Sequence, residues 1–235
     1  MNKKDLVTII IPCKNEEKYI NILLDSLRRQ SICPQIIIAD AKSTDDTLLI
    51  IESFSKLLDI VTIDGGNVSY ARNQGALLAD TEYLLFIDAD MELKDSRLIE
   101  KTITAMVAND YDLATTNLKC NSKNILGDII YYLNNIGQRL SAILNSPFST
   151  GAFMCIKATK FKEIGGFEED MMFCEDYWLS KQIDKSKFGI IKSNIYTSDR
   201  RFKKIGYWWM IKNFILSYLN RNNREYFTKD FKYWD

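Results

Sequence analysis

The chain has 235 residues, 46% of them hydrophobic, which is enough for one sizeable domain, with or without an appendage. Lysine plus arginine and aspartate plus glutamate number 31 each, so the overall charge does not attract nucleic acid, and none is expected as a partner. There is no histidine and no C-x-x-C pair among the five cysteines, which excludes histidine-based catalysis, argues against a disulfide framework or a zinc site, and leaves oxygen atoms to bind any cation.

Strand-like and helix-like segments alternate through the first half of the chain. Strands are predicted at 7–11, 35–39, 60–63 and 83–87, and helices at 18–30, 45–55 and 70–79. This rhythm, with connections of a few residues, predicts an α/β fold with a mostly parallel sheet and helices on both faces. An apolar stripe marks the first helix, and the Ser-Thr-Asp-Asp run at 43–46 is typical of a capping box that begins the second.

The uncharged strand at 83–87 ends at two carboxylates, Asp88 and Asp90. Open α/β sheets bind ligands at the carboxyl ends of their strands, and carboxylates there suit a hard divalent cation that also bridges phosphate oxygens. A diphosphate bound through Mg²⁺ or Mn²⁺ is therefore expected. The structural alternative is a simple turn in which Asp90 or Asp95 caps the next helix.

The turns after the first two strands, 12–17 and 40–46, carry carboxylate, amide and backbone groups at the same edge of the sheet. Such groups suit the ribose hydroxyls and the base edge of a nucleoside. Neither turn contains a glycine-rich phosphate fingerprint, which argues against dinucleotide oxidoreductases and P-loop ATPases. Taken singly, each turn is better explained as a plain helix cap than as a ligand contact.

Farther along, Glu175 and Asp176 follow two glycines and begin a short helical pattern among apolar and aromatic neighbours. The structural reading is a carboxylate at a helix start, where it complements the helix dipole. The functional reading is a general base, whose pKa burial would raise. Basic residues occur later at Arg200 and Arg201, where guanidinium groups could bind phosphate or form a solvated turn, and only one of the two is expected to point inward.

The carboxyl-terminal stretch 206–220 forms a helical pattern with Trp208, Ile211, Ile215, Tyr218 and Leu219 on one stripe. It either packs on its own domain or lies on a membrane surface, where aromatic and basic residues are common. No stretch is long enough to span a membrane, and the apolar run at the amino terminus is too short for a signal peptide. The chain is therefore expected in the cytoplasm, with peripheral contact to the inner face of the membrane as an option.

A further helix is predicted at 125–144. Its residues Tyr131, Tyr132 and Arg139 either line an acceptor groove or pack against the domain.

Blocks of this sequence resemble family 2 glycosyltransferases, in the order and spacing of that family. The blocks are 8–17, 36–47, 70–75, 86–90 and 150–176, with a further Arg-Arg-aromatic stretch at 197–202, and they cover roughly 6–205. The resemblance implies a GT-A fold over 1–205, with a nucleotide-sugar-binding half at 1–118 and an acceptor-side half at 119–205. The stretch 206–235 then forms an amphipathic helix and a tail.

The resemblance also implies roles for individual residues. Asp40 would contact the base, Asp88 would lie near the ribose, and Asp90, with Asp88, would bind Mn²⁺ or Mg²⁺ on the donor diphosphate. Asp176 would be the general base, with Glu175 orienting it or binding acceptor hydroxyls. The complete set implied to bind the nucleotide sugar is Pro12, Lys14, Asn15, Glu16, Asp40, Arg72, Asp88, Arg200 and Arg201.

Two departures from the family pattern concern the base and the metal. Asp40 is followed by Ala41-Lys42 where the family often has Asp-Gly or Gly-Gly, so the base preference stays open. Some relatives offer a late histidine to the metal, and this chain has none, which leaves Asp90, phosphate and water.

The function implied is a metal-assisted, inverting transfer of a sugar from a nucleotide-diphosphate sugar to a hydroxyl acceptor, either a growing glycan or a lipid-linked molecule, as in cell-surface polysaccharide synthesis. The alternatives are a nucleotidyltransferase of similar fold, a retaining transferase, and a non-catalytic nucleotide-binding scaffold in a glycan-assembly complex. A nucleotidyltransferase usually has a glycine- and lysine/arginine-rich phosphate loop near its amino terminus, which residues 12–16 lack.

Overall fold

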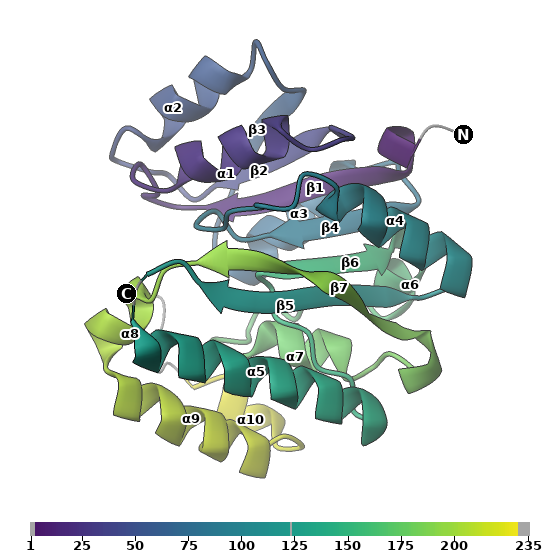
Figure 1. Cartoon of the computed structure of the whole chain (residues 1–235), viewed down its shortest axis with the longest axis vertical. Helices are drawn as coiled ribbons and strands as arrows, with labels where there is room; N and C mark the ends of the chain where they lie inside the picture. The colour runs from purple at the N-terminus through teal and green to yellow at the C-terminus, as the bar shows by residue number, and fades with distance from the viewer. Residues whose placement is uncertain (1–2, 123, 230–235) are drawn as a thin grey trace.

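The computed structural model describes residues 3–122 and 124–229 and is built on a seven-stranded sheet (Figure 1). The strand order is β3-β2-β1-β4-β6-β5-β7. All pairs are parallel except those of β6, which runs antiparallel to both β4 and β5. The sheet is therefore mostly parallel, as the βαβα rhythm predicted. The strands are β1 (Val7–Cys13), β2 (Ile36–Asp40), β3 (Ile60–Asp64), β4 (Tyr83–Ile87), β5 (Leu113–Cys120), β6 (Phe153–Lys157) and β7 (Phe188–Thr197).

Helices cover both faces of the sheet. One face packs α1, α2 and α4 against alternate strand residues, and the other packs α3, α6 and α7. The α-helices are α1 (Ile20–Arg28), α2 (Thr47–Phe54), α3 (Val68–Leu78), α4 (Leu98–Asn109), α5 (Ile125–Ile143), α6 (Ala158–Glu163), α7 (Glu175–Ser180), α8 (Arg200–Ile205), α9 (Tyr207–Leu219) and α10 (Arg224–Phe227), with 3₁₀ turns η1 (Lys3–Leu6) and η2 (Lys185–Lys187). Residues 230–235 of the predicted tail lie outside the described residues.

The core forms because the central strands are apolar on both faces. Strands β1, β2 and β4 are buried along almost their whole length. The apolar stripe predicted for the first helix is confirmed, since Ile20, Leu23, Leu24 and Leu27 are fully buried. Helix α3 lies close to β1 because it carries Gly75, where a Cβ would lie 2.5 Å from the Cγ2 of Ile10.

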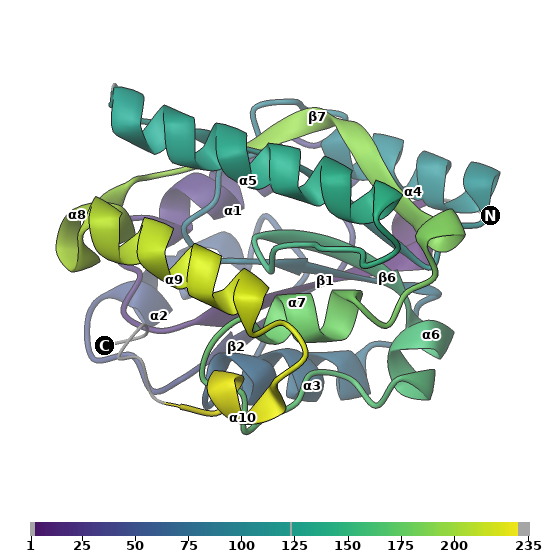
Figure 2. The ribbon, with the colours of Figure 1, turned by 90° about the horizontal axis from the view of Figure 1, so that it is seen from below.

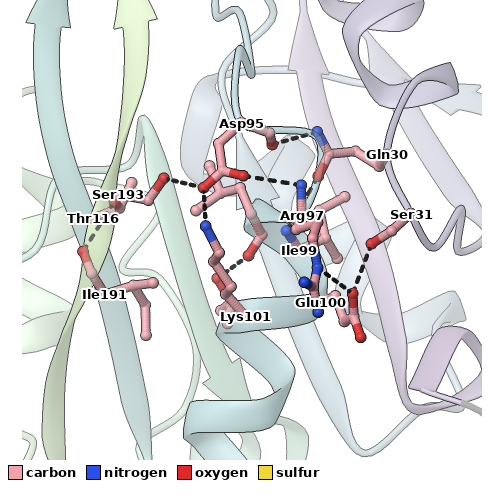
Figure 3. Close-up of polar contacts among 12 residues, drawn as sticks. Gln30, Ser31, Asp95, Arg97, Ile99, Glu100, Lys101, Thr116, Ile191 and Ser193 are labelled. Atoms are coloured by element: carbon pink, nitrogen blue, oxygen red, sulfur yellow. Dashed lines mark hydrogen bonds and ion pairs between the residues drawn. The ribbon is translucent and has the colours of Figure 1, made fainter.

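A polar network around Asp95 ties α4 and α1 to β7 (Figure 3). The Asp95 carboxylate accepts hydrogen bonds from Ser193 Oγ at 2.7 Å and Lys101 Nζ at 2.6 Å, and its carbonyl accepts one from Gln30 Nε2 at 2.9 Å. Burial opposes the charge on Asp95, but these donors lower the pKa of its carboxyl. Ser193 lies where the pairing of β5 with β7 slips out of register after Thr116, so the network holds an irregular part of the sheet in place.

Helices α5 and α9 lie side by side beyond β5, where Ile130 packs against Met210 (Figure 2). The stripe predicted for α9 faces outward: Trp208 and Leu219 are 84% and 67% exposed, whereas Met210 and Asn213 are buried. The helix thus packs through a face that includes a polar residue, because the Asn213 side chain is already satisfied by donating to the Trp209 carbonyl. Helix α5 also exposes apolar residues along its outer side, among them Ile125, Leu133, Ile143 and Leu144. Within the described residues, none of the helices is both long and apolar enough to cross a membrane.

Candidate active site

The predicted site segments meet at one edge of the sheet, where β1, β2, β3 and β4 have their carboxyl ends. They surround an opening of about 1180 Å³. We call it the donor-side cleft, after the role that the sequence predicts for it. Among the residues predicted to bind a nucleotide sugar, it is lined by Pro12, Lys14, Asn15, Glu16, Asp88, Arg200 and Arg201, together with Asp90.

The turns after β1 and β2 are joined by hydrogen bonds from one to the other. Ser43 Oγ accepts from the Asn15 backbone at 2.8 Å, and the Asn15 side chain accepts from the Thr44 backbone at 2.8 Å. The predicted capping box at 43–46 is therefore wrong. The Ser43 hydroxyl accepts a hydrogen bond from the Asn15 backbone, and the Asp46 backbone N–H donates to the Glu17 side chain on the other turn. Asn15 has a φ of 52°, a strained conformation that is held by these cross-turn bonds.

Asp40 lies beneath the cleft and does not line it. Its carboxylate is buried and accepts hydrogen bonds from the Ser43 backbone at 2.9 Å and the Ser43 hydroxyl at 2.5 Å. The structure therefore gives Asp40 a role in shaping the second turn, and its contact with a base stays a prediction.

A third turn, which sequence reasoning missed, also lines the cleft. It follows β3 and consists of Gly65, Gly66 and Asn67. A Cβ at Gly65 would lie 2.8 Å from the Ala39 carbonyl oxygen, so the turn can approach β2 only because it carries glycine. The rule that selected the first two turns would have found this one as well, since it is the next strand end in the parallel sheet.

Arg200 bridges two carboxylates across the donor-side cleft. Its guanidinium pairs with Glu16 and lies 3.1 Å from Asp90 Oδ2. Burial raises the pKa of both carboxyls, and Arg200 opposes that effect. The other oxygen of Glu16, Oε2, is buried without a hydrogen-bond partner. Arg201 also lines the cleft, so the expectation that only one arginine points inward is wrong; both occupy the first turn of α8, which begins at the cleft wall.

Asp90 and Asp88 are the carboxylates predicted to bind a divalent cation, and one oxygen of each pairs with an arginine, Arg200 and Arg72 respectively. No group of three or more acidic or cysteine side chains comes together in the described ranges 3–122 and 124–229 to form a complete metal site. A site of two carboxylates nevertheless fits Mg²⁺ or Mn²⁺ in this setting, because such ions commonly take one or two protein carboxylates and complete their coordination with phosphate oxygens and water. The buried Asp90 carboxyl, whose charge burial disfavours, would gain from a cation.

Arg72 is fully buried and connects the two halves of the site. It donates to Asp88 Oδ1 and to Glu175 Oε1, both at 2.7 Å. It therefore contacts Asp88, at the end of β4, through one nitrogen and Glu175, at the start of α7, through the other. Gly151 makes room for it, since a Cβ there would lie 2.2 Å from the Arg72 Nη2 atom.

Asp176 stands at the start of α7 and faces a second opening. Its Oδ2 accepts a hydrogen bond from the Gly151 backbone at 2.8 Å. Burial, and next the charge of Glu175, raise the pKa of Asp176 to about 7, although the Gly151 bond and Arg72 act in the opposite sense. Cys174, just before the pair, has a φ of 57°, so the backbone that presents the two acids is strained. A carboxyl with such a pKa can exchange a proton near neutral pH.

The second opening has a volume of about 140 Å³. We call it the acceptor-side cavity, after the role that the sequence predicts for Asp176. Asp88, Asp90 and Arg201 line both this cavity and the donor-side cleft, so the two spaces meet at these three residues. Of the residues predicted for an acceptor groove, Tyr131 lines the cavity, Tyr132 is 63% exposed, and the Arg139 side chain donates to Asn117 at 3.1 Å.

Comparison with known proteins agrees with this arrangement. A family model described as Glycosyl transferase family 2 matches residues 8–165. The 4,4'-diaponeurosporenoate glycosyltransferase of Staphylococcus haemolyticus is 34% identical over 110 residues, which is 45% of this chain and 29% of that protein. The protein of the same name from a bovine strain of Staphylococcus aureus is 35% identical over 116 residues, 48% of this chain and 29% of that one. The chain thus spans under a third of the length of these relatives.

Solved structures share the fold. TarS of S. aureus, residues 1–349 in complex with UDP-GlcNAc, superposes with a TM-score of 0.63 at 20% identity, covering 82% of this chain and 58% of TarS. The mannosyltransferase PcManGT from Pyrobaculum calidifontis, in complex with GDP-Man and Mn²⁺, superposes with a TM-score of 0.62 at 17% identity, covering 88% and 64%. The predicted α/β architecture, a GT-A sheet flanked by helices, is confirmed. Because the family model matches more than half of the chain, this protein belongs to glycosyl transferase family 2.

Proposed function

We propose that the chain transfers a sugar from a nucleotide-diphosphate sugar to a hydroxyl acceptor with inversion, and that Asp176 is the general base. The observation that carries the proposal is the meeting of the donor-side cleft with the acceptor-side cavity at Asp88 and Asp90, with Asp176 on the wall of the cavity. A donor sugar at that junction would present one side to its diphosphate and the other to the acceptor.

In the proposed step the acceptor oxygen attacks the anomeric carbon as the bond from that carbon to the diphosphate oxygen breaks. The acceptor proton passes to Asp176, and the nucleoside diphosphate leaves with the electron pair of the broken bond. A general base held in place contributes roughly 10²- to 10⁴-fold to such a rate. The raised pKa of Asp176 supports this role, because a base is most effective when its pKa lies near the working pH.

The donor would be held in the cleft by its nucleoside and its diphosphate. The unpartnered Oε2 of Glu16 suits a ribose hydroxyl, and the turns of Pro12, Lys14 and Asn15 supply further polar groups. Arg200 and Arg201 would bind the diphosphate oxygens. A divalent cation on Asp90, with Asp88, would neutralise charge on the leaving group when it is bound. The Mn²⁺ in the PcManGT complex supports the choice of ion.

The carboxyl-terminal segment 206–220 is proposed to lie on the inner face of an anionic membrane. Outside the two arginines of the cleft, residues 203–221 contain four lysines or arginines and no acid, in a chain whose charges balance overall. The outward stripe of α9 adds aromatic and aliphatic side chains to that charge, the combination that suits a membrane interface. Sedimentation with vesicles should then require anionic lipid and weaken with salt; equal sedimentation with neutral vesicles would refute the electrostatic part.

Thermal-shift binding of UDP, GDP, CDP and dTDP, each with and without Mn²⁺, tests the donor assignment, because a ligand of the native state raises the melting temperature. One diphosphate is expected to give a shift that depends on the metal. Product analysis with the matching nucleotide sugar would then show whether the anomeric configuration is inverted. A chain that shifts with none of the four would favour a scaffold role, and release of pyrophosphate would favour a nucleotidyltransferase.

A further inference from the structure

The acceptor-side cavity has two kinds of wall. One part carries the acids and arginines described above, with several polar side chains. The other part carries apolar side chains, among them Leu118, Ile130, Phe148, Phe202, Met210 and Phe214. Apolar protein cavities of about this size accept a hydrocarbon group of roughly the size of benzene. Sugar rings, in contrast, would leave their hydroxyls without partners against such walls, at a considerable cost in affinity.

Two of the uncharged polar side chains in the lining have a buried atom without a partner. These atoms are Asn134 Nδ2 on α5 and Thr150 Oγ1, next to the Gly151 amide that bonds Asp176. A buried donor or acceptor left unpaired is costly, so native proteins usually supply a partner. The cavity therefore combines a polar region near Asp176 with an apolar part.

The cavity also reaches the surface beside α9. Phe214 lines it and is 38% exposed, and the neighbouring outward side of α9 carries Ile215 and Tyr218. A molecule longer than the cavity could therefore continue outward along apolar surface. We propose that the acceptor is an amphiphile, with its hydroxyl-bearing head at Asp176, Thr150 and Asn134 and its hydrocarbon body in the cavity and along α9. This inference rests on the proposed glycosyl transfer and names the class of its acceptor.

The test compares two ligands with the same head group, octyl β-D-glucoside and methyl β-D-glucoside, by calorimetric titration below the micelle concentration. Each methylene removed from water contributes about fourfold to affinity. Octyl glucoside is therefore expected to bind at one site at least tenfold more tightly than methyl glucoside. Equal affinities would overturn the proposal.

Variants locate the bound chain. Ala152, which is buried in the cavity wall, is changed to leucine, and Ile130 is changed to phenylalanine to fill the cavity from the α5 side should the first variant not fold. Either should weaken octyl glucoside binding at least tenfold, and Ile143→Ser, on the exposed side of α5, should leave it unchanged. If octyl glucoside binding weakens only in Ile143→Ser, the detergent adsorbs on the exposed side of α5, and the proposal is overturned.

Donor binding is measured in the same samples by the nucleoside diphosphate shift. A nucleoside diphosphate shift in the wild type, together with equal binding of the two glucosides, refutes the amphiphile and leaves the transferase standing. In Ala152→Leu the nucleoside diphosphate shift is expected to persist while octyl glucoside binding falls. Binding of octyl glucoside without any nucleotide shift counts against the proposed function instead.

The polar region has its own matched pair of variants on α5. Asn135 exchanges hydrogen bonds of 2.9 and 2.8 Å with the backbone of Leu118, whereas the Asn134 amide nitrogen has no partner. Asn134→Leu should therefore keep or raise the melting temperature, and Asn135→Leu should lower it. A fall for Asn134→Leu would show that its amide serves the fold, which would remove it from the acceptor site.

Discussion

Replacing Asp176 with asparagine should stabilise the protein at alkaline pH while stopping transfer. The pKa of this carboxyl is raised from 3.8 to about 7, chiefly by burial. Its folded pKa lies above its unfolded pKa, so its contribution to stability is full below pH 4 and is lost as the pH rises to about 7. Three pH units at about 1.36 kcal/mol each give an upper limit of about 4 kcal/mol, and partial exposure to the cavity will reduce it.

Asparagine stays neutral at every pH and can still accept the hydrogen bond from Gly151 through its amide oxygen. The free energy of unfolding, measured with urea at pH 4.5 and pH 8, should therefore favour the variant by a few kcal/mol more at the higher pH. Comparing the two proteins at each pH cancels the titration of all other groups. A difference between the proteins that does not change with pH would refute the raised pKa.

The same variant distinguishes loss of the general base from loss of donor binding. The nucleoside diphosphate shift should be unchanged, and transfer should fall by roughly 10²- to 10⁴-fold. In the wild type, transfer should rise with pH up to about 7 and then level, since the ionised carboxylate is the active form. Full transfer activity in the variant would show that another group takes the proton.

Three further outcomes are expected. Arg72→Lys should lower the free energy of unfolding in urea by about 3 kcal/mol, because one ammonium cannot pair with both Asp88 and Glu175. The exposed control Arg28→Lys should change it by less than about 0.5 kcal/mol. Equal effects of the two substitutions would contradict the buried bridge. Gly151→Ala should lower the free energy of unfolding by about 1 to 3 kcal/mol, because the added methyl group displaces the guanidinium of Arg72. An unchanged stability would mean that the backbone around residue 151 moves to make room for the methyl group. Asp95→Asn should lower stability by about 1 to 3 kcal/mol through its network. The control Asp25→Asn, at a half-buried side chain that pairs with the exposed Arg28 and Arg29, should not. An unchanged melting temperature in Asp95→Asn would show that the network does not stabilise the fold (Figure 3).

The first half of the fold could be predicted from the sequence because its local signals agree with one another. Strand β4 was predicted at 83–87, the residues it occupies, and β1 to β3 differ from prediction by one or two residues. In these segments an apolar run correctly indicates a buried strand, and the first turn residue after it marks the edge of the sheet. Strands β5 and β7 gave no comparable signal, since polar residues such as Thr115 and Asn117 find partners in distant segments, the Phe153 and Ser193 carbonyls.

Parts of the site that depend on contacts between distant segments could not be predicted. The sequence marked Arg72, Asp88 and Glu175 separately, but only the fold shows that a buried guanidinium joins the two acids. The packed face of α9 was equally hidden, because the bond from Asn213 to a carbonyl of its own helix allows a polar residue to be buried. Periodicity gives a helix its two faces, and the neighbours decide which one is covered.

The antiparallel strand β6 has a consequence for synthesis on the ribosome. Strands β1 to β4 pair with one another in a parallel set that is complete at residue 87. The remaining neighbour of β4 is β6, and the two neighbours of β5 are β6 and β7, which come later in the chain. A nascent chain that has emerged only as far as residue 152 would hold β5 without a partner and β4 as an open edge. We expect limited proteolysis of a chain arrested there to cut beyond about residue 112 while 7–87 stays protected, so the strands whose ends form the larger cleft would be assembled before β6 and β7 exist.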